Sequence, residues 1–266
     1  MDVSQVRHDL IAEQDALDAI VSVLDPEQWR MPTPSPGWTV ADQIGHLAYF
    51  DDAAAVAITD PDGFIRLANE FLVAAGGGGL EAADDWTLAP FRAMTPEDLL
   101  DAWRANRRRL ADASSALANE TRVAWYGPSM SSRSFLTARI MEAWAHGQDV
   151  VDAVGAHRPA SDRLHHIAQL GFITRGWSYT NRGLEAPDEP VRLTLNSPSG
   201  AKWHFGAESA TESAEGAAEE FCLVVTQRRH LDDTDLVATP LAREWLLISQ
   251  AYAGPATEGP DPGTRA

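Results

Sequence analysis

The chain has 266 residues, of which 44% are hydrophobic, enough for one large domain or two smaller ones with a real core. Its formal net charge is −18, which repels nucleic acids and anionic membranes, so we expect neither as a partner. No apolar run reaches the roughly 18 residues of a membrane span, and the N-terminus lacks a signal-peptide pattern, so a cytoplasmic protein is expected. The single cysteine, Cys222, excludes an internal disulfide and cysteine-based zinc ligation, and its apolar neighbours indicate a core position.

The first part of the sequence shows the apolar spacing and the start signals of helices. Thr39, with Asp42 three residues on, is a candidate helix cap, and Thr95-Pro96 is a strong helix start. A proline-rich stretch over 31–38 and four glycines over 76–79 predict loops. Helices are predicted over residues 3–24, 40–59, 64–75, 95–118, 132–154 and 161–179. This pattern predicts an antiparallel helical bundle.

The pattern changes near residue 183. Residues 190–205 alternate apolar and polar side chains around the turn sequence Ser197-Pro-Ser-Gly200, which predicts a β-hairpin. Two helices are predicted to follow, over 211–228 and 240–253. The fold class is therefore α+β with two domains: a helical bundle over 1–183 and a small α+β domain over 184–253. Residues 254–266 are rich in proline and glycine and predict a disordered tail.

Glu142 and His146 are four residues apart on one predicted helix, so their side chains lie on the same helix face. A carboxylate and an imidazole placed in this way form half of a metal site, and His46 on another predicted helix is the candidate third ligand. Three protein ligands leave one coordination position open, as a catalytic zinc requires. Taken alone, the pair also fits a plain Glu–His hydrogen bond, and His46 also fits a surface histidine.

Two acidic residues are candidates to orient the imidazole rings. Asp42 lies one turn before His46, and Asp149 lies three residues after His146. The arginines at positions 104 and 107–109 are predicted to form a solvated face.

Two motifs resemble those of a known family. The run Gly37-Trp-Thr-Val-Ala-Asp-Gln-Ile-Gly-His46-Leu resembles the second-helix motif of DinB-like four-helix metal proteins. The run Glu142-Ala-Trp-Ala-His146-Gly-Gln-Asp149 resembles the fourth-helix motif of the branch that contains mycothiol-dependent maleylpyruvate isomerase. The resemblance implies a DinB-like bundle with His46, Glu142 and His146 as metal ligands. It also implies a C-terminal domain similar to a sterol-carrier protein.

A third motif lies in that C-terminal domain. Phe221-Cys-Leu-Val-Val-Thr-Gln-Arg-Arg229 resembles the family's Thr/Ser-Gly-Arg helix end, whose arginine faces the active site, although Gln227 here replaces the glycine. The resemblance implies that Arg228 or Arg229 is a catalytic residue that binds a substrate carboxylate or a cofactor oxygen through its guanidinium group. A solvated arginine pair favoured by the helix dipole is the alternative.

The resemblance implies a zinc-dependent enzyme that uses the small thiol mycothiol as cosubstrate. Zinc would deprotonate the bound thiol, and the thiolate would add to a small electrophile, giving isomerisation or, where sulfur is retained, transfer. A thiol-independent metal hydrolase or lyase and a non-catalytic protein that binds a metal and a small molecule stay open as alternatives. Two histidines and one carboxylate also suit non-haem iron, so zinc, iron and nickel are all open, as are the electrophile and the oligomeric state.

Overall fold

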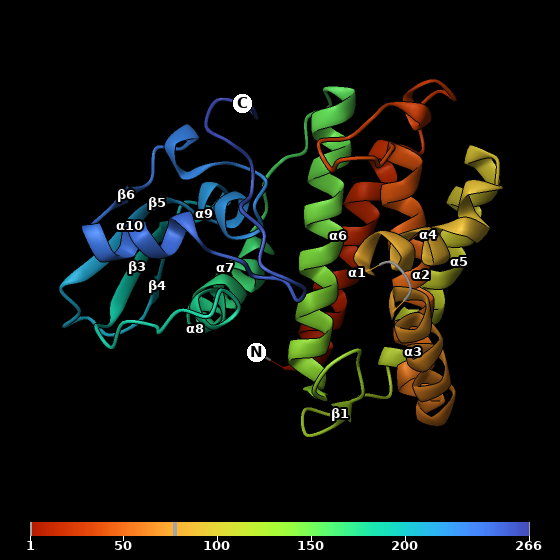
Figure 1. Cartoon of the computed structure of the whole chain (residues 1–266), viewed down its shortest axis with the longest axis horizontal. Coiled ribbons are helices and arrows are strands. Elements are labelled where there is room, and N and C mark those ends of the chain that lie inside the picture. Colours follow the sequence, from red (N-terminus) through yellow and green to blue (C-terminus); the bar gives the residue numbers. More distant parts are fainter. Residues whose placement is uncertain (1, 77–78, 266) are drawn as a thin grey trace. The chain divides into compact units, whose positions relative to one another are not determined.

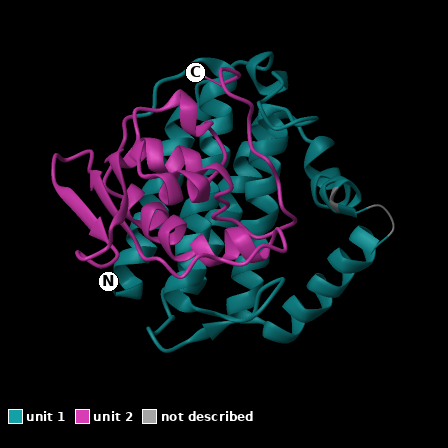
Figure 2. Cartoon of the chain, turned by 60° about the vertical axis from the view of Figure 1, so that its left-hand side comes forward, with its two compact units in different colours: residues 1–158 teal, residues 159–266 magenta. Residues whose placement is uncertain are grey.

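The computed structural model describes residues 2–76 and 79–265 (Figure 1). Its contacts divide the chain into two compact units, residues 1–158 and 159–266 (Figure 2). Unit 1 is mainly helical, whereas unit 2 combines helices with a four-stranded sheet, so the predicted α+β organisation is confirmed. Within the described residues, no helix has both the length and the apolar content that crossing a bilayer would need.

Four long helices build the core of unit 1. They are α1 (Val3–Val21), α2 (Val40–Thr59), α5 (Pro96–Ser114) and α6 (Ser132–Val154). Helix α2 packs against α5 and α6, and α1 packs against the same two helices. Large apolar side chains from all four helices are buried between them, including Leu17, Ile44, Leu47, Trp103 and Val150. The bundle predicted from apolar spacing is therefore present.

The helix starts predicted at Thr39 and at Thr95-Pro96 are confirmed. The Thr39 hydroxyl accepts a hydrogen bond from the Asp42 backbone, and the Asp42 carboxylate accepts one from the Thr39 backbone, which completes the capping box of α2. Helix α6 ends at Gly155, whose φ of 65° suits glycine. These caps fix the ends of the two helices that carry the candidate ligands.

Two further helices, α3 (Pro61–Gly76) and α4 (Gly79–Arg92), pack against α2. The sequence did not predict α4, because glycines precede it and Pro90 lies inside it. Gly76 and Gly79 of the predicted glycine loop belong to these helices, and residues 77 and 78 lie outside the described residues. A short turn, η1 (Gln28–Arg30), follows α1, and a small hairpin of β1 (Arg122–Val123) and β2 (Met130–Ser131) precedes α6.

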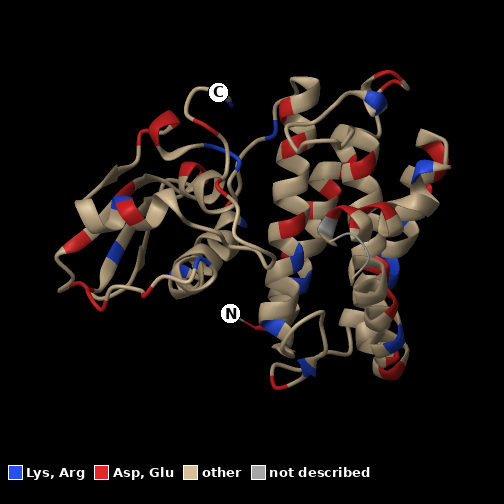
Figure 3. Cartoon of the chain, viewed as in Figure 1, with Lys and Arg blue, Asp and Glu red and all other residues tan. Residues whose placement is uncertain are grey.

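Ion pairs join the helices of unit 1, along which acidic and basic residues are both found (Figure 3). Asp18 of α1 accepts hydrogen bonds from Arg104 and Arg107 of α5, each at 2.6 Å. Arg107 also lies 2.8 Å from Asp15. The prediction that Arg104 and Arg107 form only a solvated face was therefore wrong, because the partner aspartates are on a helix distant in sequence.

The sheet of unit 2 has the strand order β4-β3-β5-β6. Strand β3 (Val191–Asn196) pairs antiparallel with β4 (Lys202–Phe205), which confirms the predicted hairpin. Strand β5 (Glu212–Ala217) runs parallel to β3, and β6 (Val237–Ala238) runs antiparallel to β5. The other elements of unit 2 are α7 (Leu164–Ile173), α8 (Arg175–Thr180), α9 (Ala218–Val225), η2 (Leu231–Asp233) and α10 (Pro240–Leu247).

The C-terminal half departs from the sequence prediction at several points. The helix predicted over 161–179 begins at Leu164 and is divided into α7 and α8, and the helix predicted over 240–253 ends at Leu247. The boundary between the units follows Arg158 rather than residue 183, because α7 packs against α9 and β4. The helix predicted over 211–228 begins only at Ala218, since the preceding residues form β5. The predicted disordered tail makes specific hydrogen bonds: Arg182 donates to the Thr257 carbonyl, and the Gly263 amide donates to the Asp233 carboxylate.

Candidate metal centre

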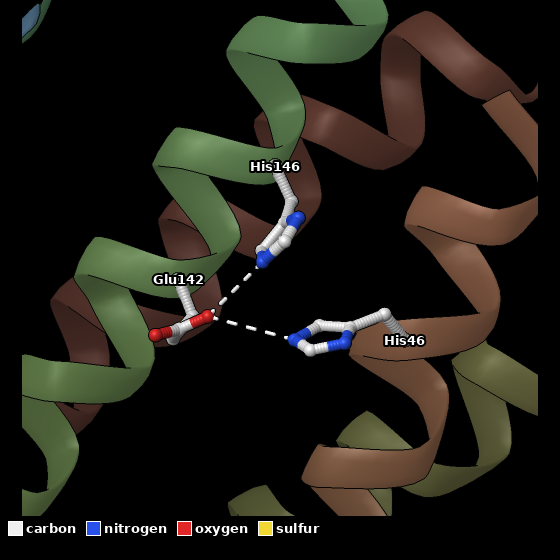
Figure 4. Close-up of side chains that lie close together, drawn as sticks. All are labelled: His46, Glu142 and His146. Carbon is white, nitrogen blue, oxygen red and sulfur yellow. Dashed lines mark hydrogen bonds and ion pairs between the residues drawn. The ribbon is translucent and has the colours of Figure 1, made fainter. Parts of the chain in front are cut away.

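Three side chains from two helices meet inside unit 1 (Figure 4). His46 comes from α2, and Glu142 and His146 come from α6, with one potential ligand atom of each lying within 4.8 Å of the other two. Nε2 of His146 lies 3.1 Å from Oε2 of Glu142, and Nε2 of His46 lies 3.7 Å from the same oxygen. The three residues predicted from the sequence to be metal ligands are therefore close enough together to contact a single ion.

Helix geometry explains this convergence. Glu142 and His146 are one turn apart on α6, so both project from the face that packs against α2. On α2, the neighbours Ile44 and Leu47 are buried in the core, and His46 lies beside them at the edge of that core. Packing of the two helices thus brings the third candidate ligand to the first two.

Aromatic rings enclose parts of the site. The Trp38 ring stacks on His146 with a centroid distance of 5.8 Å and an interplanar angle of 15°, and its centroid lies 5.1 Å from that of His46. Phe50, one turn after His46, lies 4.5 Å from the His46 ring. These rings keep water from the sides of the imidazoles that they cover, which strengthens electrostatic interactions at the site.

The protonation states of the site suit a metal ion. Burial is the main cause that lowers the pKa of His46 to about 4, and the neighbouring His146 lowers this pKa further. Burial raises the pKa of Glu142, but hydrogen bonding and charge from His146 and His46 outweigh burial and hold that pKa well below its usual value. At neutral pH the site therefore offers a neutral His46 and an ionised Glu142, as metal binding requires.

Gln43 of α2 is a member of the site that the sequence interpretation missed. Its Oε1 lies 2.5 Å from Nδ1 of His146, and its side chain is fully buried. A signal was present, because Gln43 occupies the apolar face of α2 together with Val40 and Leu47. A polar side chain at such a core position needs a hydrogen-bond partner.

Asp42 is not the residue that orients His46, whereas a role for Asp149 beside His146 stays a prediction. Asp42 does not bond to His46: its carboxylate accepts from Thr39 and, at 2.7 Å, from Arg92. Within the described part of the chain, Nδ1 of His46 is buried and has no hydrogen-bond partner. Asp149 is fully buried and accepts a hydrogen bond from the Ser35 hydroxyl at 3.1 Å.

A buried ion pair between α6 and α2 lies next to the site. Arg139, three residues before Glu142, donates to Asp51 of α2 at 2.9 Å, and both side chains are almost fully buried. Gln14 and Trp103 donate to the other oxygen of the same carboxylate. Arg139 is therefore paired with Asp51, although its charge is still the smallest of the causes that act on the pKa of His46.

The predicted catalytic arginines follow α9 in unit 2. Nη1 of Arg228 donates to the Thr226 carbonyl at 2.7 Å, and Nη1 of Arg229 donates to the Arg228 carbonyl at 2.8 Å. Gln227 has a φ of 59°, in the left-handed region that favours glycine, which is the residue of the resembled motif. Substrate binding by either arginine stays a prediction. Cys222 is fully buried, and burial raises the pKa of its thiol, so the expected core position is confirmed.

Curated proteins similar to this chain extend over nearly its whole length. Two uncharacterized proteins of Mycobacterium tuberculosis, from strains CDC 1551 / Oshkosh and ATCC 25618 / H37Rv, are each 44% identical to it over 252 residues. The alignments cover 94% of this chain and 96% of each relative.

Solved structures share the fold. The crystal structure of the mycothiol-dependent maleylpyruvate isomerase aligns with a TM-score of 0.56 and 18% identity, covering 98% of this chain and 97% of that one. A histidine-to-alanine mutant of that isomerase aligns with a TM-score of 0.56 and 17% identity, covering 86% of this chain and 90% of the mutant chain.

The family model described as the mycothiol maleylpyruvate isomerase N-terminal domain matches residues 10–151, a range that contains all three candidate ligands. The chain therefore belongs to the mycothiol maleylpyruvate isomerase N-terminal domain family.

Proposed function

We propose that this chain is a zinc-dependent enzyme that activates mycothiol for isomerisation of, or S-transfer to, a small electrophilic substrate. The observation that carries the proposal is the convergence of two imidazoles and one carboxylate, from two helices of unit 1, around a single point. Membership of the family supports mycothiol as the thiol, because the family is described by that cofactor.

The donor set fits zinc. Two imidazole nitrogens and one carboxylate oxygen are common zinc ligands, and three protein ligands leave a position open. When bound, the ion supplies the positive charge that lowers the pKa of a thiol coordinated at that position. His46 and His146 would bind through Nε2, the atoms that face Glu142, and Glu142 would add a negative charge. The rings of Trp38 and Phe50 exclude water beside the imidazoles.

The thiolate is the nucleophile of the proposed reaction. Its sulfur adds to the electrophilic carbon of a double bond conjugated to a carbonyl group, the displaced electron pair moves onto the carbonyl oxygen, and the substrate rotates about the resulting single bond. Departure of the sulfur as a thiolate restores the double bond and gives an isomer. Retention of the sulfur, with protonation of the neighbouring carbon, gives a transfer product. Arg228 or Arg229 would bind a carboxylate of the substrate or an oxygen of the thiol through its planar guanidinium group.

Metal content and thiol dependence test the proposal. We expect about one zinc ion per chain in the wild-type protein and strong loss in His46→Ala, because that substitution removes a coordinate bond. The wild-type protein is then incubated with small unsaturated acids, including maleylpyruvate, with and without mycothiol. Turnover only with mycothiol supports the proposal. Equal turnover without any thiol would instead assign a water-activating hydrolase or lyase, and metal-free wild-type protein purified without chelator would overturn the metal site.

A further inference from the structure

The loop over residues 31–38 is joined to both helices that carry the candidate ligands. The Ser35 hydroxyl donates to Asp149 of α6, and the Trp38 ring stacks on His146 of the same helix. The Thr33 hydroxyl accepts from Nε2 of Gln43 of α2 at 2.9 Å. The loop is itself closed by a hydrogen bond of 2.8 Å from the Thr33 amide to the Trp38 carbonyl. This proline-rich loop, which lies outside α2 and α6, thus contacts residues of both helices.

The Thr33 hydroxyl determines how the Gln43 amide is oriented. This hydroxyl donates its proton to the Trp38 carbonyl at 3.0 Å, so it accepts from Gln43 rather than donating to it. The amide nitrogen of Gln43 therefore faces Thr33, and its oxygen faces His146. If the Gln43 amide were reversed, the Thr33 hydroxyl would have to donate to the amide oxygen, and its hydrogen bond to the Trp38 carbonyl would be lost.

An amide oxygen accepts hydrogen bonds and cannot donate them. Nδ1 of His146, at 2.5 Å from that oxygen, must therefore carry a proton. In a neutral His146 the lone pair is then on Nε2, which faces the Glu142 carboxylate at 3.1 Å. Two acceptors at this distance repel each other unless a positive charge, either a proton or a metal ion, lies between them.

We infer that Gln43, held by Thr33, is a positioning residue that fixes His146 with its proton on Nδ1 and its Nε2 lone pair directed at the metal. The inference rests on the metal site of the proposed function but not on the thiol reaction. His46 has no equivalent support among the described residues, so the effect belongs to one ligand of the two. Partners of this kind fix the ring orientation and raise the basicity of a metal-binding histidine.

Substitution of Gln43 tests the inference by measurements that do not need enzyme activity. Gln43→Met keeps the length of the side chain and removes the acceptor, and we expect it to weaken zinc affinity about 10–100-fold in competition with a chromophoric chelator. Gln43→Glu retains an acceptor oxygen and is expected to retain tight binding. Thr33→Val, which removes the contact that orients the amide, is expected to weaken binding in the same direction but by less.

The control is Gln14→Met, which removes another buried, hydrogen-bonded glutamine of unit 1 that contacts Asp51 and none of the ligands. It should leave zinc affinity unchanged.

In nitrogen-15 spectra, the Nδ1 proton of His146 should be protected from exchange in the wild type and unprotected in Gln43→Met. Wild-type zinc affinity in Gln43→Met, or an unprotonated Nδ1 in the wild type, overturns the inference. If Gln43→Met does not fold, Thr33→Val decides: zinc affinity equal to the wild type overturns the inference. If the variants change zinc affinity as expected but the wild-type protein shows no thiol-dependent reaction, the proposed function is wrong and the inference about Gln43 stands.

Discussion

His46 and His146 lie with their ring centroids 4.3 Å apart, yet their second nitrogens have unlike surroundings. Nδ1 of His146 bonds to Gln43, whereas Nδ1 of His46 is buried and, within the part of the chain that the structure describes, has no hydrogen-bond partner. The two imidazoles are therefore unequal as candidate ligands, although both face the same carboxylate.

Alanine substitution should separate the two histidines. His146→Ala leaves the buried Gln43 oxygen without its partner, while His46→Ala removes a side chain whose own buried nitrogen is unpaired. Measured without metal, we expect His146→Ala to be less stable than His46→Ala by about 1–3 kcal/mol, the cost of a buried unsatisfied polar group. Urea denaturation of the two metal-free variants measures this difference. Equal stability would mean that the Gln43 bond contributes nothing.

Chelation should destabilise the wild-type protein. A metal that binds only the folded state stabilises it by mass action, and joining α2 to α6 through His46, Glu142 and His146 should raise the melting temperature. Thermal melts before and after dialysis against a chelator measure the effect. His46→Ala provides the control, because a variant that has already lost its metal should melt at the same temperature in both conditions.

The buried pair of Arg139 and Asp51 should be sensitive to removal of one partner. Arg139→Met leaves an uncompensated carboxylate in the core and is expected to cost about 3–5 kcal/mol of unfolding free energy. The double variant Asp51→Leu, Arg139→Met removes both charges and should recover much of this loss. Denaturation of the two variants checks the order; a double variant as unstable as Arg139→Met would show that packing, rather than charge, is responsible.

Acid should weaken the contact between α1 and α5. The hydrogen bond from Arg104 is the main reason that the pKa of Asp18 falls below 3.8 in the folded protein. The folded state therefore binds this proton less readily than the unfolded state, so the stabilisation is present above pH 3.8 and is lost as pH falls through the lowered pKa. The stability difference between the wild type and Asp18→Asn should shrink over this range. A difference independent of pH would contradict the assignment.

The strained position at Gln227 can be measured by two substitutions. Both Gln227→Ala and Gln227→Gly lose the side-chain hydrogen bonds to the Ser249 and Thr257 carbonyls, but only glycine adopts a φ of 59° without strain. We expect the glycine variant to be about 1 kcal/mol more stable than the alanine variant. Thermal or urea denaturation of the pair gives the difference, and the opposite sign would show that this backbone changes conformation in the variants.

Features with a local signal could be predicted from the sequence. The capping box depends on Thr39 and Asp42, three residues apart, and the spacing of Glu142 and His146 defines a helix face by itself. Gln43 could not be assigned a role, because its partner His146 is 103 residues away. Strand β5 lacked a signal as well: its small and acidic residues become a strand through parallel pairing with β3.

All three candidate ligands come from α2 and α6, both of which belong to unit 1. Substitutions confined to residues 159–266 therefore replace none of these three side chains. The three donor atoms identified among the described residues are thus encoded wholly by the helical unit.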